Sequence, residues 1–99
     1  MRIAIICAAA LALTPAVAWT QDQSAGRDLA ASCAMCHGTN GRGAVGYEPL
    51  AGMAQQDLVR KVTEFRSGAK PATVMHQIAK GYTDQQIRLI ADYFATQKR

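Results

Sequence analysis

The sequence predicts an all-α fold of a few helices joined by long loops, and three observations carry that prediction. Apolar residues recur at helical spacing within residues 55–67 and again from residue 84 onward. Residues 25–36 show a weaker form of the same pattern. No stretch alternates apolar and polar residues as a half-buried strand does. With 99 residues and 49% apolar content, the chain is expected to form a single domain.

The first eighteen residues are predicted to be an export signal. Arg2 precedes an apolar run at residues 3–13, and residues 16–18 have the small-x-small pattern of a cleavage site. We therefore expect residues 1–18 to be removed and residues 19–99 to form the domain in the periplasm. The alternative is an uncleaved anchor, but the run is well short of the roughly 20 residues that span a bilayer.

The mature chain is predicted to be moderately basic. Without Arg2 it holds ten Lys and Arg residues against seven Asp and Glu residues, a formal charge of +3. The basic residues are scattered and are not accompanied by an aromatic-rich nucleic-acid motif, which argues against binding of DNA or RNA. We interpret the charge as that of a solvated surface; the alternative interpretation is that it steers an acidic redox partner.

The first expected helix, residues 25–36, begins after Ser24 as its N-cap and carries two cysteines at its C-terminal end. Residues 38–46 contain four glycines and are predicted to be a loop. Such glycines serve either an ordinary surface loop or close approach of the backbone to a flat ligand. The sequence alone does not separate these two interpretations.

The second expected helix, residues 55–67, ends at Gly68, a natural C-cap. A short helical turn is expected over residues 73–80, closed by Gly81.

The last helix is expected to follow a capping box formed by Thr83 and Gln86. Its helical spacing places four apolar residues on one buried face: Ile87, Ile90, Ala91 and Phe94.

The motif that carries chemistry is Cys33-Ala34-Met35-Cys36-His37. Because Cys7 leaves with the signal, Cys33 and Cys36 are the two cysteines of the mature chain. A disulfide between them would close a very short loop and stabilise little. Two thiols at this spacing add to the two vinyl groups of a haem, and the adjacent His37 then ligates the iron. The sequence therefore predicts one covalent haem c.

Two alternatives use the same cysteine spacing. A thioredoxin-like redox pair belongs beside a βαβ pattern, which this sequence lacks. A zinc site needs further ligands, and His76 is the one other histidine. A haem also supplies a large apolar surface, which a mature chain of 81 residues needs for its stability.

The sixth iron ligand is predicted to be Met75, because thioether sulfur commonly partners His in electron-carrying cytochromes. Met75 lies thirty-eight residues after His37, far enough to reach the opposite face of the haem. Met35 lies between the cysteines, and Met53 is expected to pack in the core. His76 is the competing ligand. A vacant sixth position, suited to a gas-binding or sensing haem protein, is a further alternative.

A ligating histidine usually donates its other ring N–H to a carbonyl. The segment at Pro49 is a candidate to present that carbonyl to His37, since proline fixes the local backbone. The alternative is an ordinary turn proline.

With these residues in hand, the chain resembles class I cytochromes c. The resemblance runs from the Cys33–Gly38 motif through residues 47–52 and Met75 to the aromatic last helix. It implies His37 and Met75 as axial ligands. It also implies that the first and last helices cross, with Tyr93 and Phe94 against residues 26–29.

More narrowly, residues 65–68 and 73–83 are similar to the cytochrome subunit of flavocytochrome c sulfide dehydrogenases. Some members of that family carry two haem domains, whereas this chain has one such motif. With seven scattered carboxylates and two histidines, one of them assigned to the iron, the sequence offers no catalytic acid–base pair or nucleophile, and we expect a periplasmic electron-transfer protein rather than an enzyme. The resemblance also implies redox protein partners, with a sulfide-oxidising flavoprotein as the electron donor.

Overall fold

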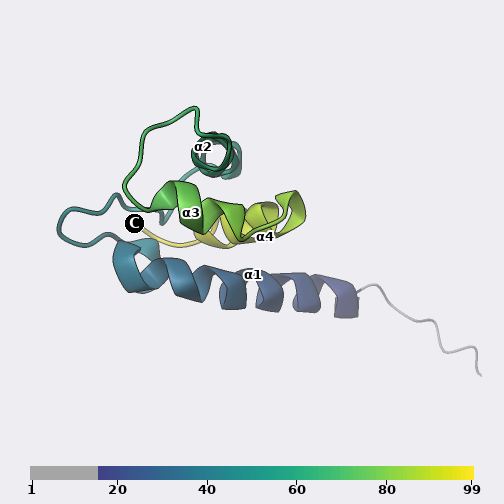
Figure 1. The fold of residues 1–99 in the computed structure, drawn as a ribbon. Coiled ribbons are helices and arrows are strands. Elements are labelled where there is room, and N and C mark those ends of the chain that lie inside the picture. The colour runs from purple at the N-terminus through teal and green to yellow at the C-terminus, as the bar shows by residue number, and fades with distance from the viewer. Residues whose placement is uncertain (1–15) are drawn as a thin grey trace, which may run out of the picture.

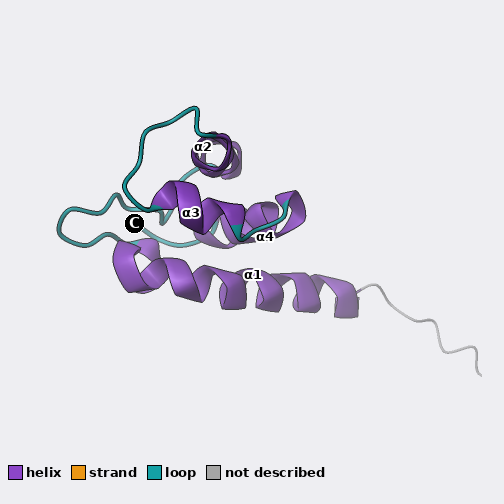
Figure 2. Cartoon of the chain, viewed as in Figure 1, coloured by secondary structure: helices purple, strands orange, loops and turns teal. Residues whose placement is uncertain are grey.

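The computed structural model describes residues 16–99, and these residues fold into helices joined by loops (Figures 1 and 2). In chain order the elements are α1 (Ala16–His37), a 3₁₀ turn (Thr39–Gly41), α2 (Gln55–Ser67), α3 (Met75–Lys80) and α4 (Asp84–Ala95). Within this range the β-structure is a single isolated bridge between Ala44 and Tyr47. The predicted all-α fold is confirmed.

Helix α1 begins earlier than the sequence pattern indicated. It starts at Ala16 rather than at residue 25, so Ser24 lies inside the helix and its predicted N-cap role is wrong. Residues 16–24 contain no proline or glycine, and the helix therefore meets no residue that would stop it. Of the predicted signal peptide, residues 1–15 lie outside the described residues, and its cleavage stays a prediction.

Helix α2 has the predicted bounds, and Gly68 ends it as expected. Gly68 takes a left-handed conformation at φ 83°, and its N–H donates to the carbonyl of Phe65. Helix α3 begins at Met75, two residues later than predicted, and ends before Gly81.

Helix α4 begins with the predicted capping box. The Thr83 hydroxyl accepts from the backbone N–H of Gln86 at 3.1 Å, and the Gln86 side chain accepts from the N–H of Thr83 at 2.9 Å. These reciprocal bonds satisfy two backbone donors that the helix itself leaves unpaired. The predicted buried face is confirmed in full: Ile87, Ile90, Ala91 and Phe94.

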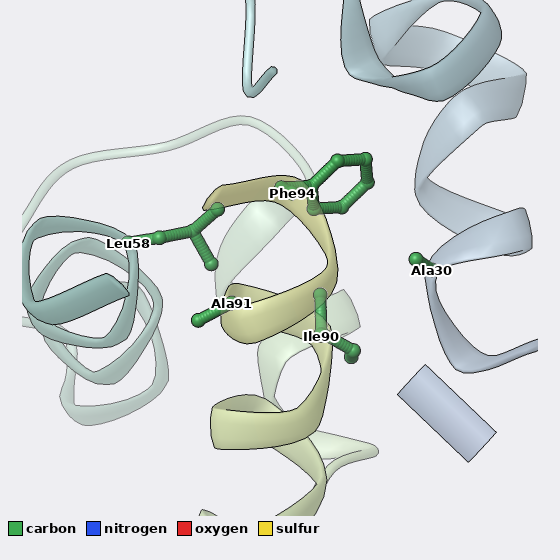
Figure 3. Packing of buried hydrophobic residues seen from close by; sticks show 5 residues of the cluster. All are labelled: Ala30, Leu58, Ile90, Ala91 and Phe94. Atoms are coloured by element: carbon green, nitrogen blue, oxygen red, sulfur yellow. The ribbon is translucent and has the colours of Figure 1, made fainter. Parts of the chain in front are cut away.

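Helix α4 lies between α1 and α2 at the centre of the core (Figure 3). Ala91 faces Leu58 of α2, whereas Ile90 and Phe94 face the side on which α1 carries Ala30. All five residues are buried. The described part of the chain buries eight apolar residues, four of which are alanines, so it builds only a small core of its own.

Helices α1 and α4 lie beside each other (Figure 1), and their close approach is at Gly26. A Cβ atom at position 26 would lie 2.6 Å from the carbonyl oxygen of Leu89 and 3.6 Å from Cβ of Tyr93. The contact of the first helix with the last, expected from the resemblance, is confirmed here. A residue without a side chain allows the two backbones to meet.

Candidate haem site

The last turn of α1 carries the two thiols and the histidine of the motif. Cys33 and Cys36 are three residues apart on one helix, so their side chains lie on the same side of α1. Both are free thiols; Cys33 is partly buried and Cys36 is exposed. Burial raises the pKa of the Cys33 thiol above its ordinary value. The two sulfurs are therefore available for covalent attachment of a ligand.

His37 is the last residue of α1, and its ring is fixed by one hydrogen bond and one ring contact. Its Nδ1 atom lies 2.7 Å from the carbonyl oxygen of Glu48. With Nδ1–H donating to that carbonyl, the lone pair of Nε2 stays available for a metal. The ring also meets Tyr47 edge-on, with the ring centroids 5.8 Å apart.

The carbonyl that holds His37 belongs to Glu48, so the assignment to Pro49 was wrong by one residue. The physical reason lies in the order of the two residues. A proline restricts the backbone of the residue before it to extended conformations. Pro49 therefore fixes the orientation of the Glu48 carbonyl, and it is this carbonyl that meets His37. The carboxylate of Glu48 forms an ion pair with Lys61 of α2, which ties this loop to the core.

The glycine-rich loop after His37 packs against the protein's own core. Gly41 is buried at φ 73°, and a Cβ there would lie 2.6 Å from the ring of Phe94. Its carbonyl accepts from the N–H groups of Leu50 and Ala51 at 2.6 and 2.8 Å. Gly43 donates its N–H to the carbonyl of His37 at 2.7 Å. At Gly41 the missing side chain therefore serves internal packing.

The candidates for the sixth ligand differ in their surroundings. Met35 is 88% exposed, and Met53 packs against the core cluster. Met75 is the first residue of α3 and is partly buried. In the view of Figure 1 that end of α3 lies at the same end of the molecule as the last turn of α1. Ligation by Met75 stays a prediction.

His76, the competing ligand, has a polar atom that the described residues leave without a partner. Its Nδ1 is buried and makes no hydrogen bond within that part of the chain. A buried, unpaired polar atom is costly, and a bound group that accepts or donates a hydrogen bond would remove the cost.

Exposed apolar side chains accompany the predicted haem-binding residues, and they provide a test of whether a haem fits. Met35 lies between the two cysteines, and Tyr47 contacts the ring of His37. Val74 and Ile78, which flank Met75 along the chain, are 50% and 42% exposed. A flat apolar group bound at these residues would cover surface that water now reaches. The residues present therefore fit a haem.

The family model for cytochrome c matches residues 23–98, which covers every element described above except the start of α1. The chain belongs to the cytochrome c family. Haem c, attached through the Cys-x-x-Cys-His motif, is the cofactor that this family implies. The prediction of a class I cytochrome c is confirmed.

Two relatives of this cytochrome c have sulfur compounds in their names. It is 39% identical over 72 residues to the cytochrome subunit of sulfide dehydrogenase from Chlorobaculum tepidum, covering 73% of this chain and 66% of that protein. It is 39% identical over 71 residues to the thiosulfate dehydrogenase electron acceptor from Thiomonas intermedia, covering 70% of this chain and 33% of that protein. The cytochrome thus spans less than two thirds of each relative.

Two solved structures of cytochrome c4 share the fold of this cytochrome c. The Acidithiobacillus ferrooxidans protein has a TM-score of 0.63 and 36% identity, over 65% of this chain and 37% of that one. The Pseudomonas stutzeri protein has a TM-score of 0.73 over 80% of this chain and 50% of that one; at 20% identity it supports the fold alone.

Sequence reasoning on this cytochrome c missed two residues of the site, Tyr47 and Glu48. The proline at position 49 was the available signal for Glu48, because it constrains the residue before it.

No helix in residues 16–99 is both long enough and apolar enough to cross a membrane.

Proposed function

We propose that this cytochrome c is an exported, single-haem electron carrier. In this proposal Cys33 and Cys36 would form the thioethers, and His37 and Met75 would ligate the iron. The observation that carries the proposal is the geometry of His37. It directly follows two free thiols, and its Nδ1 is held at 2.7 Å by the carbonyl of Glu48.

The bound haem supplies a ferric–ferrous couple that takes up and releases one electron. The chain's own residues hold it and set its surroundings. Cys33 and Cys36 would hold the haem covalently: addition of an S–H group across a vinyl C=C bond would place sulfur on one carbon and hydrogen on the other, with no leaving group. The hydrogen bond to Glu48 orients the His37 ring and raises its basicity. Met75 supplies a soft thioether ligand, which raises the reduction potential.

Apolar side chains have a further part in this proposal. Tyr47, Val74 and Ile78 are exposed in the protein alone. Packed on a haem, they would limit the access of water and lower the local dielectric constant, and these quantities tune a redox potential.

We propose that the electron donor is a dehydrogenase that oxidises an inorganic sulfur compound. The support comes from the relatives, one named as the cytochrome subunit of sulfide dehydrogenase and one as a thiosulfate dehydrogenase electron acceptor. The predicted signal at residues 1–18 supports a periplasmic location, where such a donor would meet the cytochrome.

Stopped-flow mixing tests the proposal. The oxidised, haem-loaded protein is mixed with a sulfide-oxidising flavoprotein and sulfide, and haem reduction is followed by absorbance. We expect reduction that requires both the flavoprotein and sulfide. If dithionite reduces the haem but the flavoprotein with sulfide does not, the proposed donor is wrong and the carrier function stands. A protein that binds no haem would contradict both.

A further inference from the structure

A cleft of about 470 Å³ opens beside the hydrogen bond that holds His37. Four charged residues line the cleft: the cationic Arg42, Lys61 and Arg99, and the anionic Glu48. The remaining lining comes from Pro49, Ala51 and Met53. Among the lining side chains, three cations stand against one carboxylate, so the side chains give the cleft a net positive charge.

The two arginines of the cleft are held in place without being neutralised. Arg42 donates from Nε to the carbonyl of Lys98 at 3.2 Å, and Arg99 donates from Nη2 to the carbonyl of Gly52 at 3.4 Å. Neither forms an ion pair with a carboxylate of residues 16–99, whereas Lys61 pairs with Glu48. Both guanidinium groups therefore keep donors for a further anion.

The cleft and the haem site share one residue. Glu48 lines the cleft with its side chain, which pairs with Lys61, and its backbone carbonyl accepts from His37. An anion that contacts Lys61 would compete with the carboxylate of Glu48. Because the backbone carbonyl of Glu48 holds His37, displacing the carboxylate of Glu48 from Lys61 would change the hydrogen bond to His37 and, through it, the ligand field of the iron.

We propose that this cleft binds the carboxylates of an acidic segment on a protein redox partner. Guanidinium forks match carboxylates in a bidentate geometry, which favours an acidic side chain as the occupant. The volume lies in the range of about 300–1,000 Å³ typical of ligand sites, so a single inorganic oxyanion would leave most of it unfilled. Pro49 and Met53 add apolar surface for the stem of such a segment. The proposal rests on the proposed carrier function, which requires a protein partner.

Occupancy of the cleft is expected to depend on the oxidation state. Ferric haem carries one more positive charge than ferrous haem, so a nearby carboxylate stabilises the ferric form and lowers the potential. Linkage is reciprocal, and the acidic segment therefore binds the oxidised protein more tightly. For a one-electron couple, a tenfold difference in affinity corresponds to a shift of about 59 mV.

Isothermal titration of the haem-loaded protein at low ionic strength tests the proposal. The probes are a hexaglutamate peptide, a hexaglutamine peptide and sodium sulfate. We expect hexaglutamate to bind, to bind more weakly as salt is added, and to bind better than either other probe. Binding of hexaglutamate no tighter than hexaglutamine would overturn the proposal. Tighter binding of sulfate would overturn it too, by indicating a site for small oxyanions.

A pair of double variants locates the binding. The double variant Arg42→Gln with Arg99→Gln is expected to bind hexaglutamate about tenfold more weakly, because two ion pairs are lost. Arg27→Gln with Arg88→Gln removes the same charge from exposed positions outside the cleft and should have little effect. Equal losses in the two variants would contradict the cleft as the site.

NMR of the unaltered protein covers the case in which the cleft variant does not fold. Hexaglutamate is expected to shift the amide signals of Arg42, Glu48 and Lys61, and shifts confined to other regions would overturn the proposal. Because these measurements need no electron donor, they stay informative if a sulfide dehydrogenase fails to reduce the protein.

Discussion

The Nδ1 atom of His37 lies 2.7 Å from the carbonyl oxygen of Glu48, and Pro49 follows directly. The helix that carries the thiols thus ends on a histidine whose orientation is set by a loop eleven residues later. The ion pair of Glu48 with Lys61 ties that loop to α2. The histidine is thereby anchored to a loop that is itself tied to α2.

Pro49→Ala should raise the reduction potential. Without the proline, the backbone of Glu48 is less restricted and its hydrogen bond to His37 weakens. A weaker bond makes the imidazole a poorer donor to ferric iron. Loss of about 0.5–1 kcal/mol from this bond corresponds to roughly 20–40 mV. Protein-film voltammetry measures the shift. Pro71→Ala, in an exposed loop, is the control and should leave the potential unchanged; an unchanged or lower potential for Pro49→Ala would contradict this account.

Met75→Leu should abolish the weak absorbance at about 695 nm that marks a Met–iron bond in the oxidised protein. The potential should fall, and the reduced form should bind carbon monoxide at the vacated position. His76→Gln is the control, because it changes the adjacent side chain and leaves the thioether in place. Persistence of the band in Met75→Leu would exclude Met75 as the ligand. Its loss in His76→Gln alone would favour His76.

Gly41→Ala should be much more destabilising than Gly46→Ala. Both glycines have positive φ, 73° and 80°, so each substitution costs about 1–2 kcal/mol of backbone strain. At position 41 the new Cβ would also meet the ring of Phe94 at 2.6 Å, which adds about 1–3 kcal/mol. Position 46 has no heavy atom within 4 Å of a Cβ. Denaturant unfolding of the haem-loaded variants measures their free energies of unfolding. An equal decrease in the two variants would refute the packing argument.

Asp84 should titrate below its ordinary pKa. The hydrogen bond and charge of Arg66 lower the pKa of this exposed carboxyl, and Arg88 contributes less. A depressed native pKa means that its stabilisation is present above the unfolded-state pKa and is lost as pH falls through the native one. In an NMR titration, Arg66→Gln should raise the pKa of Asp84 clearly, and Arg88→Gln should raise it less. The reverse order would be incompatible with the Arg66 ion pair.

The elements that depend on local chemistry could be predicted from the sequence. The bounds of α2 and the capping box of Thr83 and Gln86 follow from residues close together in the chain. The start of α1 was missed because Ser24 has a capping side chain but lies in a segment without a helix breaker.

Apart from the contact of the first helix with the last, which the resemblance implied, long-range relationships were beyond sequence reasoning. The contact of Gly41 with Phe94 joins residues far apart in the chain, and no local pattern signals it. The cleft likewise collects Arg42, Lys61 and Arg99 from three separate segments. The carbonyl that holds His37 was placed one residue late because the sequence shows the proline, whereas the bond comes from the residue that the proline constrains.

Mass spectrometry of the protein isolated from a host with cytochrome c maturation tests the central claim most directly. We predict an addition of about 616 Da, the mass of one haem, to a chain that lacks residues 1–18. Fragmentation should place that mass on the peptide containing Cys33 and Cys36, with neither thiol open to alkylation. A colourless protein at the mass of the bare chain, with two alkylatable thiols, would contradict the account.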